Sequence, residues 1–293
     1  MSTSQIDTTS YDVPSPSRAG ILMVKTGRLL ASYIILIAIA VVMVAPFIAM
    51  ISVSLQTGSR AAVFPIDWIP AKPTLDNYRS LLEHSKILRW FGNSLFVATV
   101  GTLIALGTAT TAGYAFARMR FTGRSVLFWA FLSMLMIPGE VTLIPQYMLL
   151  SKIGWVNTYQ ALILPGVTSA FGIFMVRQYL QALPKDYEEA ARMDGASEFQ
   201  VFWQIVLPML TPAIATLGTI QFLNYWNEFL YPLIVTSKAA MRTLPVGLAT
   251  LETPTGGLPE TLAGTTLAIV PTVAVFLFFQ KYFVRGIATT GLK

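Results

Sequence analysis

Charged residues divide the chain into long apolar segments. Each segment is long enough to hold the roughly 20 apolar residues with which a helix crosses the hydrocarbon core of a membrane. Five of them contain no charge at all: 29–59, 90–117, 153–176, 199–227 and 261–280. A sixth begins after Arg124 but is interrupted early by Pro138, Gly139 and Glu140. The pattern predicts an all-α, polytopic membrane protein with six transmembrane helices, at about residues 29–53, 91–115, 125–149, 160–181, 210–235 and 262–284.

The composition excludes a single soluble domain and several kinds of enzyme. Hydrophobic residues make up 54% of the 293 and charged residues only 12%, whereas an average soluble protein has roughly 25% charged residues. There is no cysteine, which rules out disulfides, a thiolate nucleophile and cysteine metal sites, and His84 is the single histidine. No acid–base pair suited to catalysis lies within the apolar segments. We therefore expect no metal and no cofactor bound by this chain, and no enzymatic activity of its own.

The two ends of the chain are expected in the cytoplasm. Residues 1–19 are rich in serine, threonine and proline, which is typical of a disordered tail. The apolar segment that follows is longer than the roughly 7–15 apolar residues of a signal peptide, so we interpret it as a transmembrane helix that is not cleaved off. With both ends inside, 12 lysine and arginine residues face the cytoplasm and 8 face outward, the bias that membrane proteins usually show. The net charge of +6 then reflects cytoplasmic loops rather than a nucleic-acid partner.

Small residues recur every fourth position in the second predicted span. Gly101, Ala105, Ala109 and Gly113 share one face of that helix. Such a face allows another helix to approach closely, so we expect a helix–helix contact there.

The loop 181–210 carries signals for two short helices. Pro184 suits a first helical turn, and Asp194-Gly195 is typical of a helix end because glycine adopts a left-handed conformation easily. Ser197 with Gln200 forms a potential capping box for a second helix, which Pro208 is expected to close. Residues 185–198 hold five acids and two bases, a net charge of −3. An acidic loop does not gain from lying on anionic lipid, so it indicates docking to a protein partner.

This loop resembles the EAA loop of ABC importer permeases. The resemblance is carried by Glu189-Ala190-Ala191, Gly195 at its expected spacing, and the segment 205–208. Supporting segments are 93–94, 113–118, 226–232, 244–247, 280–281 and 284–286. The chain looks most like the second permease subunit of the carbohydrate branch, the maltose- and glycerol-3-phosphate-type permeases. The resemblance implies a type I importer fold over residues 20–293, with a cytoplasmic coupling helix pair at about 184–208.

The resemblance also implies partners. A second, homologous permease subunit, two ATP-binding cassette ATPases and an extracytoplasmic solute-binding protein would complete the transporter in the cytoplasmic membrane, with lipid around the spans. No lysine here follows a glycine, so the chain has no P-loop, and ATP and Mg would be used by the partner ATPase. The resemblance implies that eight residues contact the ATPase or transmit force from it: Glu189, Ala190, Ala191, Asp194, Gly195, Ile205, Leu207 and Pro208.

Polar residues within the spans are candidates for a substrate pathway. Glu140 lies in the broken third span, where a carboxylate is costly unless it faces a polar interior, although it could also lie at the outer interface. Asn224, Trp226, Asn227 and Glu228 form a second cluster that also contains Tyr225, and its aromatic members could instead anchor the helix at the membrane surface. Aromatic, amide and carboxyl groups suit a sugar. The resemblance implies a carbohydrate as the substrate, and this composition is compatible with one. The alternatives are a subunit that imports a glycerol-phosphate-type solute and an ion-coupled secondary transporter.

Overall fold

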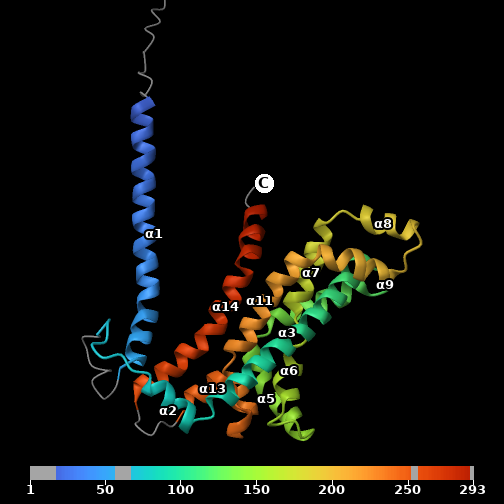
Figure 1. Ribbon diagram of the computed structural model, residues 1–293. Coiled ribbons are helices and arrows are strands. Elements are labelled where there is room, and N and C mark those ends of the chain that lie inside the picture. The colour runs from blue at the N-terminus through green and yellow to red at the C-terminus, as the bar shows by residue number, and fades with distance from the viewer. Residues whose placement is uncertain (1–17, 57–66, 252–256, 291–293) are drawn as a thin grey trace, which may run out of the picture. The chain divides into compact units, whose positions relative to one another are not determined.

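The computed structural model describes residues 18–56, 67–251 and 257–290, and these contain helices and no strand (Figure 1). The expected disordered tail falls mostly on residues 1–17, outside the described part, and helix α1 begins at Arg18, before the expected end of the tail. The helices are α1 Arg18–Ser54, α2 Asp76–His84, α3 Ile87–Arg118, α4 Arg124–Ser133, α5 Gly139–Lys152, α6 Tyr159–Ile163, α7 Ala170–Ala182, α8 Asp186–Met193, α9 Glu198–Gln200, α10 Leu207–Met209, α11 Thr211–Asn227, α12 Leu230–Val235, α13 Leu244–Ala249 and α14 Leu258–Thr290.

By length and composition, three helices of the described chain can cross a membrane, and six segments can if each bent pair of helices counts as one span, which is the number that the apolar pattern predicts. Three are single helices: Gly27–Ser54, Ile87–Arg118 and Leu258–Gln280. The other three are pairs of helices that bend at a short break, by 101° between α4 and α5, by 41° between α6 and α7, and by 74° between α10 and α11. The described residues up to Met50 form one unit, which holds most of the long apolar helix α1, and the described residues from Ile51 onward form the second unit.

Two predicted spans are interrupted more than the apolar pattern shows. The span 210–235 is not one helix, because α11 ends at Asn227 and α12 begins only at Leu230. The side chain of Glu228 accepts a hydrogen bond from the Tyr231 N–H, which supports this break. In the span 160–181, Pro165 and Gly166 separate α6 from α7, since proline cannot donate the helical hydrogen bond. Ser169 then caps α7 by accepting a hydrogen bond from the Gly172 N–H.

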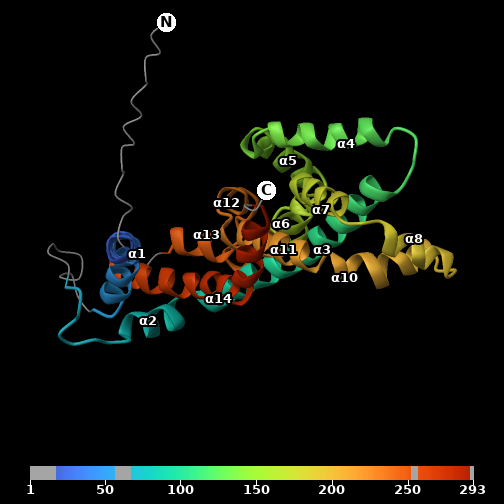
Figure 2. The same cartoon turned by 90° about the horizontal axis from the view of Figure 1, so that it is seen from above.

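Helix α3 is the central element of the second unit. It packs against both α7 and α11, and α2 and α8 lie near its opposite ends in both views (Figures 1 and 2). The small-residue face predicted from the sequence makes these contacts: Gly101 lies against the ring of Tyr225, Gly113 lies against Val176, and Ala105 and Ala109 are fully buried. The prediction of a close helix–helix contact is confirmed.

Candidate functional site

The segment 185–209 forms two short helices joined by a tight turn, which we call the knuckle. The first helix, α8, begins at Asp186 because the Lys185 carbonyl accepts the first helical hydrogen bond, from the Glu189 N–H. Pro184 therefore lies before the helix and not in its first turn, contrary to the sequence-based expectation. The acidic residues of the first turn of α8 lie at the positive end of its dipole, which stabilises them.

The turn of the knuckle has the geometry that its sequence predicts. Gly195 adopts a left-handed φ of 86°. The Ala196 N–H bonds to the Ala191 carbonyl at 3.0 Å and the Gly195 N–H to the Arg192 carbonyl at 3.1 Å, which together make a Schellman motif. The end of the first helix at this glycine is thereby confirmed.

The capping box of the second helix is also present. The Ser197 side chain accepts from the Gln200 N–H, and the Gln200 side chain accepts from the Ser197 N–H at 2.8 Å. The chain then widens into a π-helical turn over Val201–Val206 and continues through α10. Pro208 does not end this helix, contrary to expectation, because it occupies the first turn of α10, where a missing N–H is tolerated.

The residues implied to couple to an ATPase fall into two groups. Ala191 and Leu207 are half-buried and pack against the core beneath the knuckle, and Ile205 is also half-buried. The other five are exposed on the surface: Glu189, Ala190, Asp194, Gly195 and Pro208. The first group can hold the knuckle on the bundle, and the second is free to meet another protein.

Four large apolar side chains are also exposed on the knuckle, and sequence reasoning did not single them out. Tyr187, Met193, Phe199 and Trp203 are exposed, with 88% of Met193 accessible. Phe199 and Trp203 lie four residues apart with their rings 6.0 Å apart. An i, i+4 pair of aromatics in a segment expected to be a cytoplasmic loop is the signal that could have found Phe199 and Trp203. Exposed apolar groups beside acidic ones are typical of a protein-binding surface.

A buried ion pair attaches the knuckle to α3. The Arg118 Nε lies 2.6 Å from the Glu188 Oε1, and both side chains are at most 4% exposed. The second Arg118 nitrogen, Nη2, donates to the Leu183 carbonyl at 3.1 Å. Arg118 thus binds α8 and the chain that leads into it, although the two partners lie 70 residues apart in sequence.

A second ion pair joins the two helices of the knuckle. Arg192 donates two hydrogen bonds to the carboxylate of Glu198, at 2.7 and 3.2 Å, and these bonds hold the pKa of Glu198 below its usual value. The Tyr114 hydroxyl on α3 donates to the same carboxylate at 3.1 Å. Because Glu188 and Glu198 pair with arginines, the exposed acids of the knuckle without an ion pair among the described residues are Asp186, Glu189 and Asp194.

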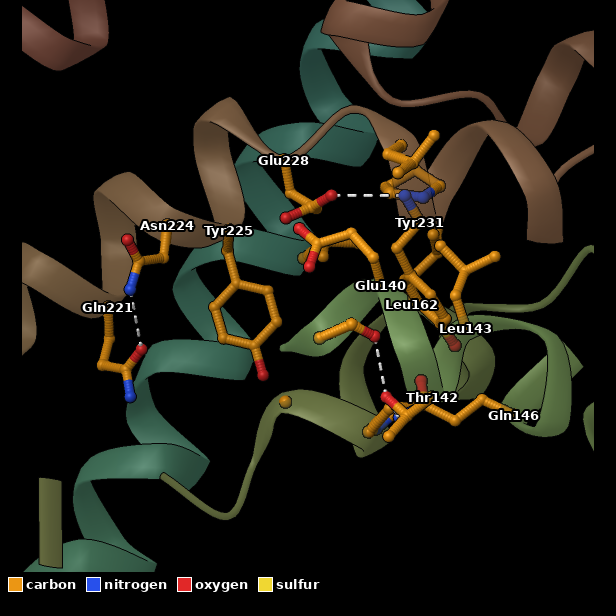
Figure 3. A pocket seen from close by; sticks show the side chains of 16 residues that line it. Glu140, Thr142, Leu143, Gln146, Leu162, Gln221, Asn224, Tyr225, Glu228 and Tyr231 are labelled. Carbon is orange, nitrogen blue, oxygen red and sulfur yellow. Dashed lines mark hydrogen bonds between the residues drawn. The ribbon is translucent and has the colours of Figure 1, made fainter. Parts of the chain in front are cut away.

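A cavity of about 350 Å³ lies farther along α3, among α3, α5, α6, α11 and α12 (Figure 3). Its polar lining groups are two carboxylates, three amides and three hydroxyls: Glu140, Glu228, Gln146, Gln221, Asn224, Thr142, Tyr225 and Tyr231. Figure 3 shows the side chains of Glu140 and Glu228 pointing toward the cavity. None of the described residues that line it is lysine or arginine.

Hydrogen bonds hold the polar walls of the cavity in place. The Tyr231 hydroxyl donates to the Ala161 carbonyl at 2.7 Å, and the Tyr225 hydroxyl donates to the Ile163 carbonyl at 3.0 Å. The Gln146 amide donates to the Thr142 hydroxyl at 3.1 Å. These bonds fix the two aromatic rings between helices. The Asn224 amide also donates to the Gln221 side chain at 3.5 Å, and Glu228 accepts from the Tyr231 N–H, so these groups have only part of their hydrogen-bonding capacity left for a solute.

The structure brings together three of the five predicted pathway residues. Glu140, Asn224 and Glu228 line the cavity. Trp226 does not, because its buried indole stacks on Phe222 and donates to the Ala268 carbonyl at 3.0 Å. Asn227, at the end of α11, is exposed away from the lining.

Five polar lining residues were not among the predicted pathway residues: Thr142, Gln146, Gln221, Tyr225 and Tyr231. Gln221 lies one helical turn before Asn224 in α11, and Gln146 lies in α5 after Glu140. The sequence did contain a signal for the two glutamines: each is an amide within an apolar span, on the same helix as a predicted pathway residue.

Comparisons with known proteins agree on one family. Residues 107–289 match the family described as "Binding-protein-dependent transport system inner membrane component". The chain is similar to the arabinooligosaccharide transport permease AraQ of Halalkalibacterium halodurans, with 42% identity over 76% of this chain and 81% of that protein. It is also similar to the trehalose/maltose transport permease MalG of Thermococcus litoralis, with 33% identity over 88% of this chain and 94% of that protein.

A solved structure shares the fold. A chain of a bacterial ABC transporter involved in the import of the acidic polysaccharide alginate superposes with a TM-score of 0.77, covering 92% of this chain and 100% of that chain. The two sequences are 22% identical, so the likeness concerns the arrangement of the helices.

Proposed function

The chain belongs to the family of binding-protein-dependent transport system inner membrane components, and from this premise we propose that it carries a carbohydrate across the cytoplasmic membrane by alternating access, driven by ATPase subunits that bind its knuckle. The observation that carries the proposal is the geometry of α3. One end of this helix holds the knuckle through Arg118, and Val97, some 30 Å away at about 1.5 Å per residue, lines the cavity.

The ATPase is a separate subunit in this proposal. The chain has no Gly-Lys step for a P-loop, so ATP and Mg would be bound by two ATPase partners. Their cleft would receive the exposed acidic and apolar side chains of the knuckle. A second, homologous permease and an extracytoplasmic binding protein complete the assembly.

The lining of the cavity favours a neutral, hydroxyl-rich solute. Amides and carboxylates accept and donate hydrogen bonds to hydroxyl groups, and aromatic rings pack on sugar faces. A glycerol-phosphate-type solute would bring a negative charge next to Glu140 and Glu228 with no described cation in the lining, which is unfavourable. A carbohydrate is therefore the better substrate for this site.

The orientation of the chain can be tested by cysteine labelling, because the protein has no cysteine of its own. Thr122 and Lys238 are exposed in loops at the two sides. We expect an impermeant thiol reagent added to intact cells to label Lys238→Cys but not Thr122→Cys, since both termini are proposed to be cytoplasmic. Permeabilised cells, in which both variants should react, serve as the control. Labelling of Thr122→Cys alone in intact cells would reverse the orientation.

Two asparagines of α11 provide a matched test of the cavity. Both are exposed and lie three residues apart, but Asn224 lines the cavity and Asn227 does not. We expect Asn224→Ala to lower uptake by about two- to tenfold, the loss of roughly one hydrogen bond, with the permease amount unchanged. Asn227→Ala should transport as the unmodified protein does. An equal loss of uptake in both variants would show that the solute does not pass through this cavity in particular.

A further inference from the structure

A second cavity, of about 460 Å³, lies at the knuckle end of α3 and is lined mainly by cations. Its walls come from the end of α3, the loop into α4, the first residue of α4, the end of α7 and the residue before α8. Figure 2 shows the loop in which the chain turns from α3 into α4. The lining residues are Ala117, Arg118, Arg120, Arg124, Gln181 and Lys185. It is distinct from the polar cavity described above and shares no residue with it.

The positive charge of this region is not compensated within the described chain. Arg118 is neutralised by Glu188. No carboxylate of the described residues lies within 4.0 Å of Arg120, Arg124, Arg177 or Lys185. Arg120 and Lys185 also line a neighbouring cavity that holds three carboxylates: Glu188, Glu189 and Glu198. Glu188 pairs with Arg118 and Glu198 with Arg192, so Glu189 is the acid of that cavity without an ion pair. Four cations without a partner create a site that attracts an anion from outside.

Arg177 is half-buried, so its unpaired charge costs more free energy than that of an exposed cation. Its guanidinium carbon lies 3.9 Å from the centre of the Phe128 ring, and its Nε donates to the Phe116 carbonyl at 3.4 Å. These contacts satisfy part of the guanidinium but bring no negative charge. A partly desolvated cation is costly unless an anion approaches it.

An apolar groove of about 210 Å³ continues from the cationic cavity. Arg124 lines both, so the groove and the cavity meet at this residue. Five of its nine lining residues are aromatic or aliphatic side chains of α3, α4 and α7, with 66% of Trp129 exposed: Phe116, Phe128, Trp129, Leu132 and Phe174. The others are Arg124, Ser125, Arg177 and Gln178. A ligand that fills both spaces has an anionic head and a hydrocarbon chain.

We propose that this composite site binds an anionic phospholipid of the cytoplasmic leaflet. The phosphate lies among Arg120, Arg124 and Lys185, and an acyl chain lies in the groove between α4 and α7. The proposal rests on the cytoplasmic placement of the loop 119–123 given under the proposed function. Cations at the cytoplasmic ends of spans lie at the depth of lipid headgroups, and the groove explains why a lipid fits better than a free phosphate. The bound lipid would brace the turn that carries Arg118, the residue that holds the knuckle.

The test is lipid binding to the purified transporter, with its partner subunits, by native mass spectrometry. The probes are phosphatidylglycerol and phosphatidylcholine with the same acyl chains. The variant Arg120→Gln/Lys185→Gln removes two exposed cations, neither of which makes a side-chain hydrogen bond among the described residues. The matched control Lys152→Gln/Lys238→Gln removes two exposed cations from the opposite side.

We expect the unmodified transporter to retain phosphatidylglycerol over phosphatidylcholine, and the Arg120→Gln/Lys185→Gln variant to weaken phosphatidylglycerol binding by about tenfold or more, since each cation near a headgroup contributes appreciably. The control should bind as the unmodified protein does. Trp129→Ala should also weaken phosphatidylglycerol binding, because it shortens the apolar groove. Millimolar inorganic phosphate should not displace the lipid.

Three outcomes would overturn the proposal. Equal retention of the two lipids would show that the site does not select an anionic headgroup. Full displacement by inorganic phosphate, with no effect of Trp129→Ala, would make it a site for free anions. If the Arg120→Gln/Lys185→Gln variant binds lipid as before but loses the ATPase from the purified complex, the cations bind that partner and not a lipid. Cysteine labelling of Thr122 reports the orientation separately, so a wrong orientation and a wrong ligand can be told apart.

Discussion

Arg118→Ala is expected to abolish most uptake while leaving the permease in the membrane. The substitution leaves Glu188 buried without its partner, and breaking a buried ion pair in this way costs about 3–5 kcal/mol. The cost falls on the attachment of the knuckle to α3, because Arg118 also donates to the Leu183 carbonyl. Uptake and ATPase activity, measured on the same reconstituted complex, should show at least tenfold lower uptake for each ATP hydrolysed.

The expected uncoupling follows from the position of α3. Its knuckle end carries Arg118, and toward its other end Gly101 touches the ring of Tyr225, a wall of the polar cavity. A movement of the knuckle can thus reach the cavity through one continuous helix. Without the ion pair between Arg118 and Glu188, the knuckle can move with the ATPase while α3 stays in place.

Two further variants separate attachment from general destabilisation. Lys152→Ala removes an exposed cation that lines neither the cation cavity nor the knuckle, and it should keep uptake and hydrolysis coupled. Arg118→Met/Glu188→Met replaces the whole pair by apolar groups of similar length, which is often neutral for stability, so it should recover much of the uptake. Normal uptake per ATP in Arg118→Ala would contradict the role of α3 in transmission.

Gly195→Val is the second substitution with a large expected effect. Gly195 has a φ of 86°, a conformation that costs a β-branched residue about 1–3 kcal/mol. Relief of this strain would open the Schellman turn and change the angle between the two helices of the knuckle. We expect the ATPase to be lost from the purified complex and uptake to fall with it, because the exposed acidic and apolar side chains would no longer form one surface.

The chain contains a matched control for backbone strain. Gly154, between α5 and α6, has a φ of 73° and, like Gly195, open space where a side chain would lie. Gly154→Val should therefore bring similar strain without loss of the ATPase. Membrane insertion, ATPase co-purification and uptake are measured for both variants. Retention of the ATPase and of uptake in Gly195→Val would reduce the knuckle to an ordinary loop.

The knuckle was predictable in detail because its signals are local. The left-handed Gly195 and the capping box of Ser197 and Gln200 involve residues at most a few positions apart, so their side chains meet their partners whenever the helix forms. Pro184 and Pro208 were placed less well. A proline is compatible with the residue before a helix, its first turn or its end, and the surrounding hydrogen bonds decide among these.

The cavity was predictable only in part. Glu140, Asn224 and Glu228 drew attention as polar groups in apolar spans, and all three line it. Trp226 carries the same signal, yet its indole is buried among other rings. Which side of α11 faces the cavity depends on how the helix is rotated in the bundle, and its polar residues alone did not reveal that rotation.

By itself, the sequence determined the all-helical membrane architecture, the positions of most spans and the capped turn of the knuckle. These features depend on the transfer of continuous apolar segments into lipid and on hydrogen bonds between near neighbours in the chain. Only the tertiary structure decided that Glu188 is buried against Arg118. From the sequence alone, its charge was expected to be available to a protein partner. The tertiary structure also decided the breaks around Leu210 and Glu228 and the cation cavity beside the knuckle. These depend on side chains from different helices, and the packing of α3 with α7 and α11 brings such side chains together.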